Sequence, residues 1–139
     1  MHSILLIDDH DDFRSIMSEI LRGADYDVWE ATCPDQAFQM LMHEQPDLII
    51  CDLHMPFVND DRMQEFQYSY EVGVKTIEEL QWAIPNVPIM ISSAAVPSDI
   101  KRITAHLKSV VTMTKPIQPR KLLATVELLV RPDAEAVLH

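Results

Sequence analysis

The chain has 139 residues, which suffices for one domain with a buried core, and its composition of 47% hydrophobic and 24% charged residues is typical of a globular protein rather than a disordered one. The net charge of -11, with no cluster of lysine and arginine, argues against direct nucleic-acid binding by this chain. The same charge weakly favours a cationic partner or a metal ion.

Five short apolar runs have the length and the boundaries of β-strands. They are "SILLID" (3–8), "YDVWEA" (26–31), "DLIICD" (47–52), "VPIMISS" (87–93) and "VVTMT" (110–114). Most are apolar throughout, which is the pattern of strands covered on both faces. The sequence therefore predicts a sheet that lies between two layers of helices.

A stretch with apolar residues at helical spacing follows each predicted strand. The first carries Phe13, Ile16, Met17, Ile20 and Leu21 on one face and reaches Gly23, where a helix would stop. The others begin at Pro34, run from Val74 to Ile84, run from about Ser98 to Leu107, and span 119–130. Helical periodicity ends there, so residues 131–139 are interpreted as a tail or the start of a linker.

Strands that alternate with helices predict an α/β fold, a doubly wound parallel sheet with helices on both faces, over residues 1–130. Such sheets bind ligands outside the carboxyl ends of their strands. Polar residues stand at that end: Asp8 and Asp9 after the first strand, Asp52 at the end of the third, Ser93 at the end of the fourth and Lys115 after the fifth. We therefore expect one shared acidic site.

The chemistry of this predicted site is that of phosphoryl transfer. Converging carboxylates repel one another until a proton or a cation neutralises them, and Mg2+ suits oxygen ligands of this kind. A lysine and a hydroxyl add donors for phosphate oxygens. The combination suits transfer of a phosphoryl group onto a carboxylate nucleophile.

At these residues the chain resembles the receiver domain of bacterial two-component response regulators. The resemblance rests on "DD" at 8–9, "D-x-x-M-P" at 52–56, "SSA" at 92–94 and "KP" at 115–116, and it extends over residues 2–130. It implies a flavodoxin-like sheet of strand order 2-1-3-4-5. It also implies that Asp52 accepts a phosphoryl group from the phosphohistidine of a histidine kinase, which makes the chain a signalling switch whose only catalysis is its own phosphotransfer and autodephosphorylation.

The resemblance further implies a role for each site residue. Asp9 and Asp52 ligate Mg2+ directly, His54 contributes its backbone carbonyl, and Asp8 acts through water. Lys115 pairs with the phosphoryl group and precedes a cis proline, Pro116. Ser93 is the switch hydroxyl, which it fits better than Ser92 because of its spacing to Lys115. Backbone amides at His54 and Ala94 bind the phosphoryl group.

Three features depart from the family pattern. Thr112 replaces an aromatic residue three positions before the lysine, which puts the coupling of ring rotation to hydroxyl movement in doubt. Lys108 replaces a glycine, which puts the turn before the fifth strand in doubt. About a dozen extra residues separate Asp52 from Pro88, and we interpret residues 57–72 as an insertion, either packed on the third helix or acting as a docking element or lid.

Three classes of protein remain open at this stage: a receiver that stands alone or relays phosphate, a receiver cut from a longer regulator, and a Mg2+-dependent phosphohydrolase on a similar fold. The third usually carries a second aspartate two residues after the nucleophile, where this chain has His54. The expected partner is a sensor histidine kinase or a phosphotransfer protein, together with an output domain or a partner protein, and a homodimer stays open.

The predicted location is the cytoplasm. Cys33 and Cys51 lack the spacing of a disulfide scaffold and suit a reducing compartment. No apolar run reaches the ~18 residues that a membrane span requires, so no contact with a membrane is expected. The first ten residues turn acidic too early for a signal peptide.

Overall fold

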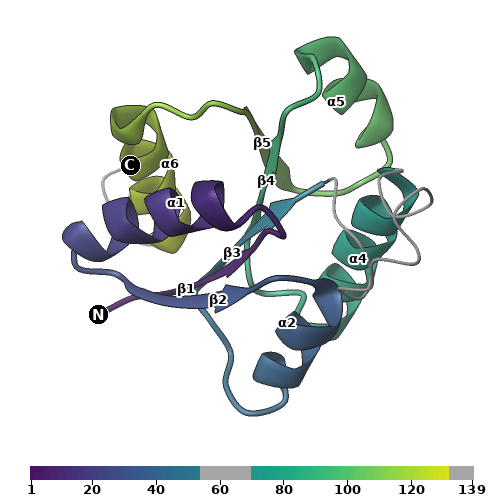
Figure 1. Ribbon diagram of the computed structural model, residues 1–139. Helices are drawn as coiled ribbons and strands as arrows, with labels where there is room; N and C mark the ends of the chain where they lie inside the picture. The colour runs from purple at the N-terminus through teal and green to yellow at the C-terminus, as the bar shows by residue number, and fades with distance from the viewer. Residues whose placement is uncertain (54–69, 132–139) are drawn as a thin grey trace, which may run out of the picture.

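The computed structural model describes residues 1–53 and 70–131, and within them a five-stranded parallel sheet forms the centre of the molecule (Figure 1). The strands are β1 (Ser3–Ile7), β2 (Asp27–Ala31), β3 (Leu48–Asp52), β4 (Ile89–Ser93) and β5 (Val110–Thr114). Their order is β2-β1-β3-β4-β5, and every neighbouring pair is parallel. The predicted fold class and strand order are therefore confirmed.

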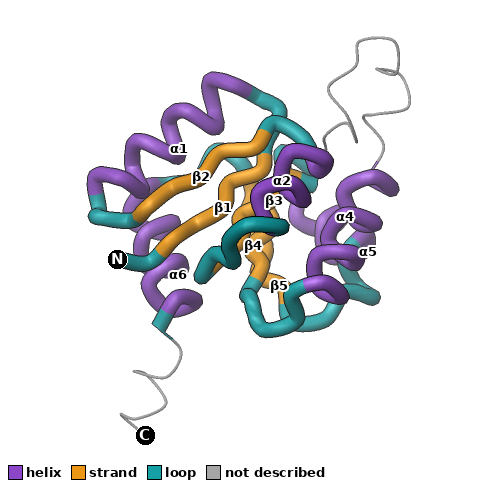
Figure 2. Tube along the Cα trace, turned by 90° about the horizontal axis from the view of Figure 1, so that it is seen from below, coloured by secondary structure: helices purple, strands orange, loops and turns teal. Residues whose placement is uncertain are grey.

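Helices cover both faces of the sheet. They are α1 (Asp11–Gly23), α2 (Pro34–Leu41), α4 (Tyr70–Ala83), α5 (Pro97–Ile103) and α6 (Pro119–Val130). Figure 2 shows α1 and α6 on one side of the orange strands and α2, α4 and α5 on the other. Two apolar clusters match this arrangement, because one joins the sheet to Met17 of α1 and Val126 of α6, and the other joins it to Ala37 of α2 and Leu80 of α4.

The central strand β3 shows why its sequence is apolar throughout. Successive side chains of a strand point to opposite faces. Ile50 packs into the cluster beneath α1 and α6, whereas Ile49 and Cys51 pack into the cluster beneath α2 and α4, and all three are fully buried. No position in this strand faces water, so the alternation of polar and apolar residues that marks a half-exposed strand is missing.

Helix α1 ends at Gly23, as predicted, and the left-handed conformation in the turn after it falls on Asp25, with φ 70°. In the turn before β5, the left-handed conformation falls on Ser109, with φ 53°, and not on Lys108, which replaces the glycine of the family pattern. Aspartate adopts this conformation more readily than most residues, whereas serine adopts it with strain.

Some helix boundaries and faces also differ from those predicted. The sequence predicts Ile16 on the inner face of the first helix, but its side chain is 57% exposed. The fourth predicted helix is shorter, because α5 ends at Ile103. Helix α4 begins at Tyr70, so residues 70–72 of the predicted insertion are helical, while residues 57–69 lie outside the described part of the chain.

Gly73 of α4 lies directly against the backbone of β3. A Cβ atom at this position would stand 1.7 Å from the carbonyl oxygen of Leu53, which is far inside the contact distance of two atoms. Leu53 follows Asp52 in sequence and is fully buried. The absence of a side chain at Gly73 therefore allows α4 to pack against the end of the strand that carries Asp52.

Two further sequence expectations concern cysteines and membranes. Cys33 and Cys51 are both buried free thiols. Burial raises the pKa of the Cys51 thiol well above its usual value, with Asp52 and Asp8 adding to the effect, so it stays protonated. Within residues 1–53 and 70–131, none of the helices has the length and apolar content needed to cross a bilayer.

Candidate functional site

Three carboxylates meet at the carboxyl end of the sheet. Asp8 and Asp9 follow β1, and Asp52 ends β3 on the neighbouring strand. One carboxylate oxygen from each lies within 4.8 Å of the others. Asp8 is fully buried and Asp52 is 5% exposed. Because β1 and β3 are parallel neighbours, their carboxyl ends lie at the same edge of the sheet, and this brings the three aspartates together.

Lys115 is the cation of the cluster. Its side chain reaches from the residue after β5 to two of the carboxylates, with Nζ 2.9 Å from Oδ2 of Asp8 and 3.5 Å from Oδ2 of Asp52. The ammonium also lies 4.1 Å from the centre of the Phe13 ring, a cation–π contact. The peptide bond from Lys115 to Pro116 is cis, as the resemblance implied.

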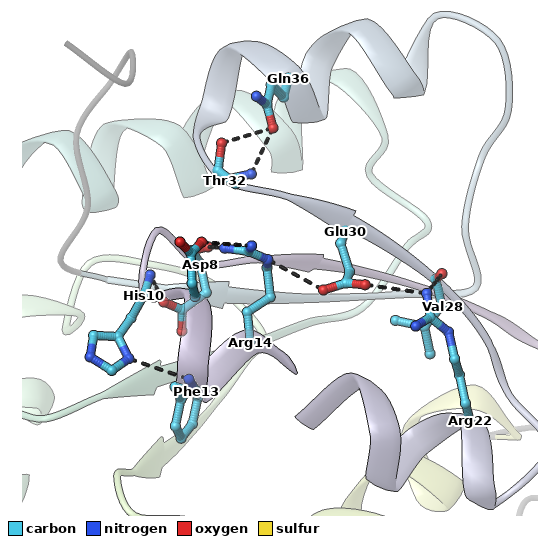
Figure 3. A network of polar contacts seen from close by, with 10 residues as sticks. Asp8, His10, Phe13, Arg14, Arg22, Val28, Glu30, Thr32 and Gln36 are labelled. Atoms are coloured by element: carbon cyan, nitrogen blue, oxygen red, sulfur yellow. Dashed lines mark hydrogen bonds and ion pairs between the residues drawn. The ribbon is translucent and has the colours of Figure 1, made fainter. Parts of the chain in front are cut away.

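The backbone and α1 hold Asp8 in place. Its Oδ1 accepts a hydrogen bond from the amide of His10 at 2.8 Å, and its own amide donates to the carbonyl of Ala31 at 3.0 Å. The guanidinium of Arg14 donates to the carbonyl of Asp8 at 2.8 Å and to Glu30 at 3.3 Å (Figure 3). Asp8 therefore has a fixed orientation toward Lys115.

Asp9 carries the clearest electrostatic sign of a cation site. Burial raises the pKa of Asp9, and repulsion from the neighbouring Asp8 raises it further, while a backbone hydrogen bond, Lys115 and His10 lower it by less. The side chain is partly exposed. A carboxylate held beside another carboxylate in this way gains stability when a divalent cation binds.

Ser93 and Ala94 stand at the end of β4, beside the cluster. Ser93 is fully buried, and its Oγ accepts a hydrogen bond from the amide of Ala95 at 3.1 Å. Its carbonyl accepts from the amide of Lys115 at 2.7 Å, which ties the ends of β4 and β5 together. Ala94 is exposed, whereas His54, the other residue predicted to bind through its backbone, lies outside the described residues.

The sequence-based reasoning missed the residues of α1 that support the site. His10 caps the helix, with Nδ1 accepting from the amide of Phe13 at 3.3 Å, and Arg14 bridges Asp8 to β2. Only the positions of His10 and Arg14 in the sequence gave a signal, because both follow the acidic pair within two helical turns. Thr112, which departs from the family pattern, is exposed on β5.

The family model of the response regulator receiver domain matches residues 4–127. The chain therefore belongs to this family, and it is a signalling module rather than an enzyme of metabolism. Its cluster of Asp8, Asp9 and Asp52 is consistent with the phosphoacceptor site of such a domain.

The curated relatives are longer than this chain. It is 28% identical over 135 residues to the transcriptional regulatory protein CpxR homolog of Haemophilus influenzae, covering 96% of this chain and 52% of that protein. It is 26% identical over 128 residues to the alkaline phosphatase synthesis transcriptional regulatory protein PhoP of Bacillus subtilis, covering 92% and 48%. The chain thus spans about half the length of these relatives.

Solved structures confirm the fold. A CheY-like receiver domain protein of Methanospirillum hungatei superimposes with a TM-score of 0.80 at 16% identity, over 98% of each chain. The chemotaxis protein CheY4 of Vibrio cholerae gives 0.76 at 21% identity, over 93% of this chain and 98% of that one. At these identities the likeness concerns the fold alone.

Proposed function

We propose that Asp52 is the phosphoacceptor of this receiver domain and that Asp8, Asp9, Ser93 and Lys115 complete its site. The observation that carries the proposal is the contact of one partly buried lysine, Lys115, with two carboxylates of the three-carboxylate cluster. Asp52 is the member at the strand end, level with β4 and within reach of Lys115. Its carboxylate supplies the nucleophile, and the ammonium neutralises charge on the incoming phosphoryl group.

The donor set fits Mg2+. All three donors are carboxylate oxygens, which Mg2+ prefers, and burial together with the adjacent Asp8 raises the pKa of Asp9, which supports a cation at this position. We assign Asp9 and Asp52 as direct ligands, with the backbone carbonyl of His54, and Asp8 as a ligand through water. When bound, the ion would neutralise developing charge on phosphate oxygens. Lys115 and the hydroxyl of Ser93 orient the phosphoryl group from the other side, and the backbone amide of Ala94 donates to it.

A receiver domain implies a histidine kinase as its partner, and the donor of the phosphoryl group is a phosphohistidine of that kinase or of a phosphotransfer protein. A similarity to a kinase partly supports this pairing. The sensor histidine kinase TmoS of Ectopseudomonas mendocina is 29% identical over 128 residues, which cover 91% of this chain and 12% of the kinase. We assign residues 1–130 to the receiver, residues 57–72 to an insertion and residues 131–139 to a tail or linker toward an output.

The test is phosphorylation by acetyl phosphate with Mg2+. The wild-type chain should gain one phosphoryl group, and Asp52→Asn should gain none. The exposed Asp12 of α1 offers a matched control, since Asp12→Asn should be labelled like the wild type. Equal labelling of the Asp52→Asn variant would show that another residue is the acceptor.

The metal assignment has its own test. Mg2+ affinity should fall more in Asp9→Asn than in Asp8→Asn, because only Asp9 is assigned as a direct ligand. Titration of each variant with MgCl2, followed by tryptophan fluorescence or amide spectra, measures this. Equal affinities in the two variants would remove the distinction.

A further inference from the structure

An aromatic ring lies beside the ammonium of Lys115, in addition to the two carboxylates. Nζ is 4.1 Å from the centre of the Phe13 ring, well inside the roughly 6 Å within which a cation is attracted to an aromatic face. Phe13 is the third residue of α1, and its side chain packs, partly buried, against the apolar cluster beneath α1 and α6. The ring therefore contacts both the core and the cation of the site.

The first turn of α1 fixes the backbone that carries this ring. The amide of Phe13 donates to Nδ1 of His10, the residue that caps the helix, at 3.3 Å (Figure 3). The next residue, Arg14, donates from its amide to the carbonyl of His10 at 2.9 Å and from its guanidinium to the carbonyl of Asp8 at 2.8 Å. The ring is thus tied to the same residue whose carboxylate binds Lys115.

The contacts of the ammonium differ in how they use its three N–H donors. The hydrogen bond to Oδ2 of Asp8, at 2.9 Å, uses one donor, and the ion pair with Asp52 at 3.5 Å acts through charge. An aromatic face attracts the positive charge through its quadrupole and requires no particular N–H. The ring can therefore hold the ammonium while the remaining donors turn toward phosphoryl oxygens.

Phosphorylation of Asp52 removes one of the negative charges that attract Lys115. An oxygen of Asp52 forms a bond to phosphorus while the bond from phosphorus to the donor breaks, and the donor leaves with the electron pair. The carboxylate of Asp52, an anion before this step, becomes a neutral acyl group. Its ion pair with Lys115 weakens as the reaction proceeds, whereas the attraction of the Phe13 ring is unchanged.

We infer that Phe13 is a positioning residue for the phosphorylation of Asp52, because its ring keeps the ammonium of Lys115 beside the site as Asp52 loses its charge. The inference rests on the proposed function of Asp52 and Lys115. A lysine side chain has much rotamer freedom, and an ammonium that nothing restrains must lose this freedom in the transition state. Loss of the aromatic face should therefore slow phosphorylation about fivefold, which corresponds to ~1 kcal/mol.

The first experiment weakens the aromatic face and leaves the shape of the side chain almost unchanged. Phe13 is replaced site-specifically by mono-, di- and trifluorinated phenylalanine, because each fluorine withdraws electron density from the ring face. The initial rate of labelling by radioactive acetyl phosphate with Mg2+ should fall stepwise, to about one fifth in the trifluorinated protein.

The same fluorinated series at Phe38 is the matched control, since Phe38 packs against the cluster beneath α2 and α4, on the other face of the sheet. There the labelling rate should stay the same. A purely structural role of Phe13 would make the two series alike, because the fluorinated rings pack similarly at both positions. Equal labelling rates throughout the Phe13 series would overturn the inference.

Two natural substitutions separate the aromatic face from apolar volume. Phe13→Leu keeps an apolar side chain against the core but should be labelled about fivefold more slowly than the wild type, whereas Phe13→Tyr keeps an aromatic face and should restore most of the rate. Equal rates for the leucine and tyrosine variants would overturn the inference.

A double-mutant cycle tests the contact itself. The free energies of unfolding of Phe13→Leu, Lys115→Met and the double variant are compared by urea denaturation. The two changes should not be additive, because the second removes nothing from a contact that the first has already broken. Additive changes would show that the ring and the ammonium do not attract each other, and would also overturn the inference.

The outcomes separate this inference from the proposed function. Labelling of Asp52→Asn at the wild-type level would overturn both. Labelling that requires Asp52, combined with a rate that does not change with fluorination of Phe13, would leave the proposed function standing and reject the role of Phe13 alone.

Discussion

Asp9 shows how a functional carboxylate lowers the stability of the fold that holds it. Its pKa is raised by burial and by the adjacent Asp8, so the folded state binds a proton more tightly than the unfolded chain does. Stability from this group is present below the unfolded pKa of 3.8 and is lost as pH rises through the higher folded pKa. At neutral pH the ionised side chain therefore opposes folding.

Asp9→Asn should melt a few degrees higher than the wild type at neutral pH in the presence of EDTA, since it removes this repulsion. The difference should shrink as pH is lowered through the raised pKa toward 3.8. Thermal unfolding by circular dichroism at several pH values measures it. Asp12→Asn is the control, because loss of an exposed charge in the first turn of α1 should lower stability slightly. A wild type more stable than Asp9→Asn in EDTA would contradict the argument.

Ser109 is a second residue at which the chain departs from the conformation that its side chain prefers. Its φ of 53° is left-handed, a conformation that costs an L residue roughly 1 kcal/mol or more and glycine almost nothing. Ser109→Gly should therefore raise the free energy of unfolding by about 0.5–1 kcal/mol in urea denaturation. Lys108→Gly, at the neighbouring position without a positive φ, should instead lower it. The reverse ranking would contradict the assignment of the left-handed conformation to Ser109.

Helix α4 meets the end of β3 through the contact of Gly73 with Leu53. Because the facing atoms belong to the backbone, they cannot rotate away from an added methyl group. The position of α4 is thereby linked to the strand end that carries Asp52. The link is local in space but joins segments on either side of residues 54–69, whose structure lies outside the described part of the chain.

Gly73→Ala should destabilise the protein by roughly 1–3 kcal/mol or more, because its Cβ would stand 1.7 Å from the oxygen of Leu53. Gly23→Ala is the matched control: its Cβ would meet nothing within 4 Å, and alanine should gain up to about 1 kcal/mol over glycine in a helix. Urea denaturation measures both. Phosphorylation of Asp52 should slow only in the Gly73 variant. Equal stability of the two variants would show that α4 can move away from β3 without cost.

On the scale of the whole molecule, charge is unevenly distributed along the chain. Residues 1–53 carry 12 of the 22 acidic residues and two of the 11 lysines and arginines, whereas residues 97–131 carry seven of those 11 and only two acidic residues. The carboxylates of the site belong to the acidic part, and Lys115 comes from the basic part. Repulsion among acidic residues is therefore greatest in the part of the chain that supplies the metal ligands.

Mg2+ should stabilise the protein more than NaCl at the same ionic strength. Screening acts on all charges alike, while a bound ion adds roughly 2.7 kcal/mol at a concentration 100-fold above its dissociation constant. The melting temperature should rise in NaCl and rise further in MgCl2. Asp9→Asn should keep the first increase and lose most of the second. An equal response of wild type and variant to MgCl2 would mean that the ion acts only through screening.

The sequence by itself determined the fold class and, through the family resemblance, the strand order, and it predicted which polar residues stand at the carboxyl ends of the strands. This was possible because each strand of a parallel sheet ends at the same edge, so Asp8, Asp9, Asp52, Ser93 and Lys115 could be placed together from the ends of apolar runs. Strands buried on both faces and helices with one apolar face leave strong signals in the sequence, which is why β3 and α6 lie within one residue of their predicted boundaries.

The tertiary structure alone decided which contacts and conformations those residues adopt. The exposure of Ile16, the left-handed conformation of Ser109 and the contact of Gly73 with Leu53 depend on neighbours far away in sequence. The same holds for Phe13. A phenylalanine on the apolar face of a helix has the pattern of a core residue, and its contact with the ammonium of Lys115 becomes visible only when the start of α1 and the end of β5 are placed together.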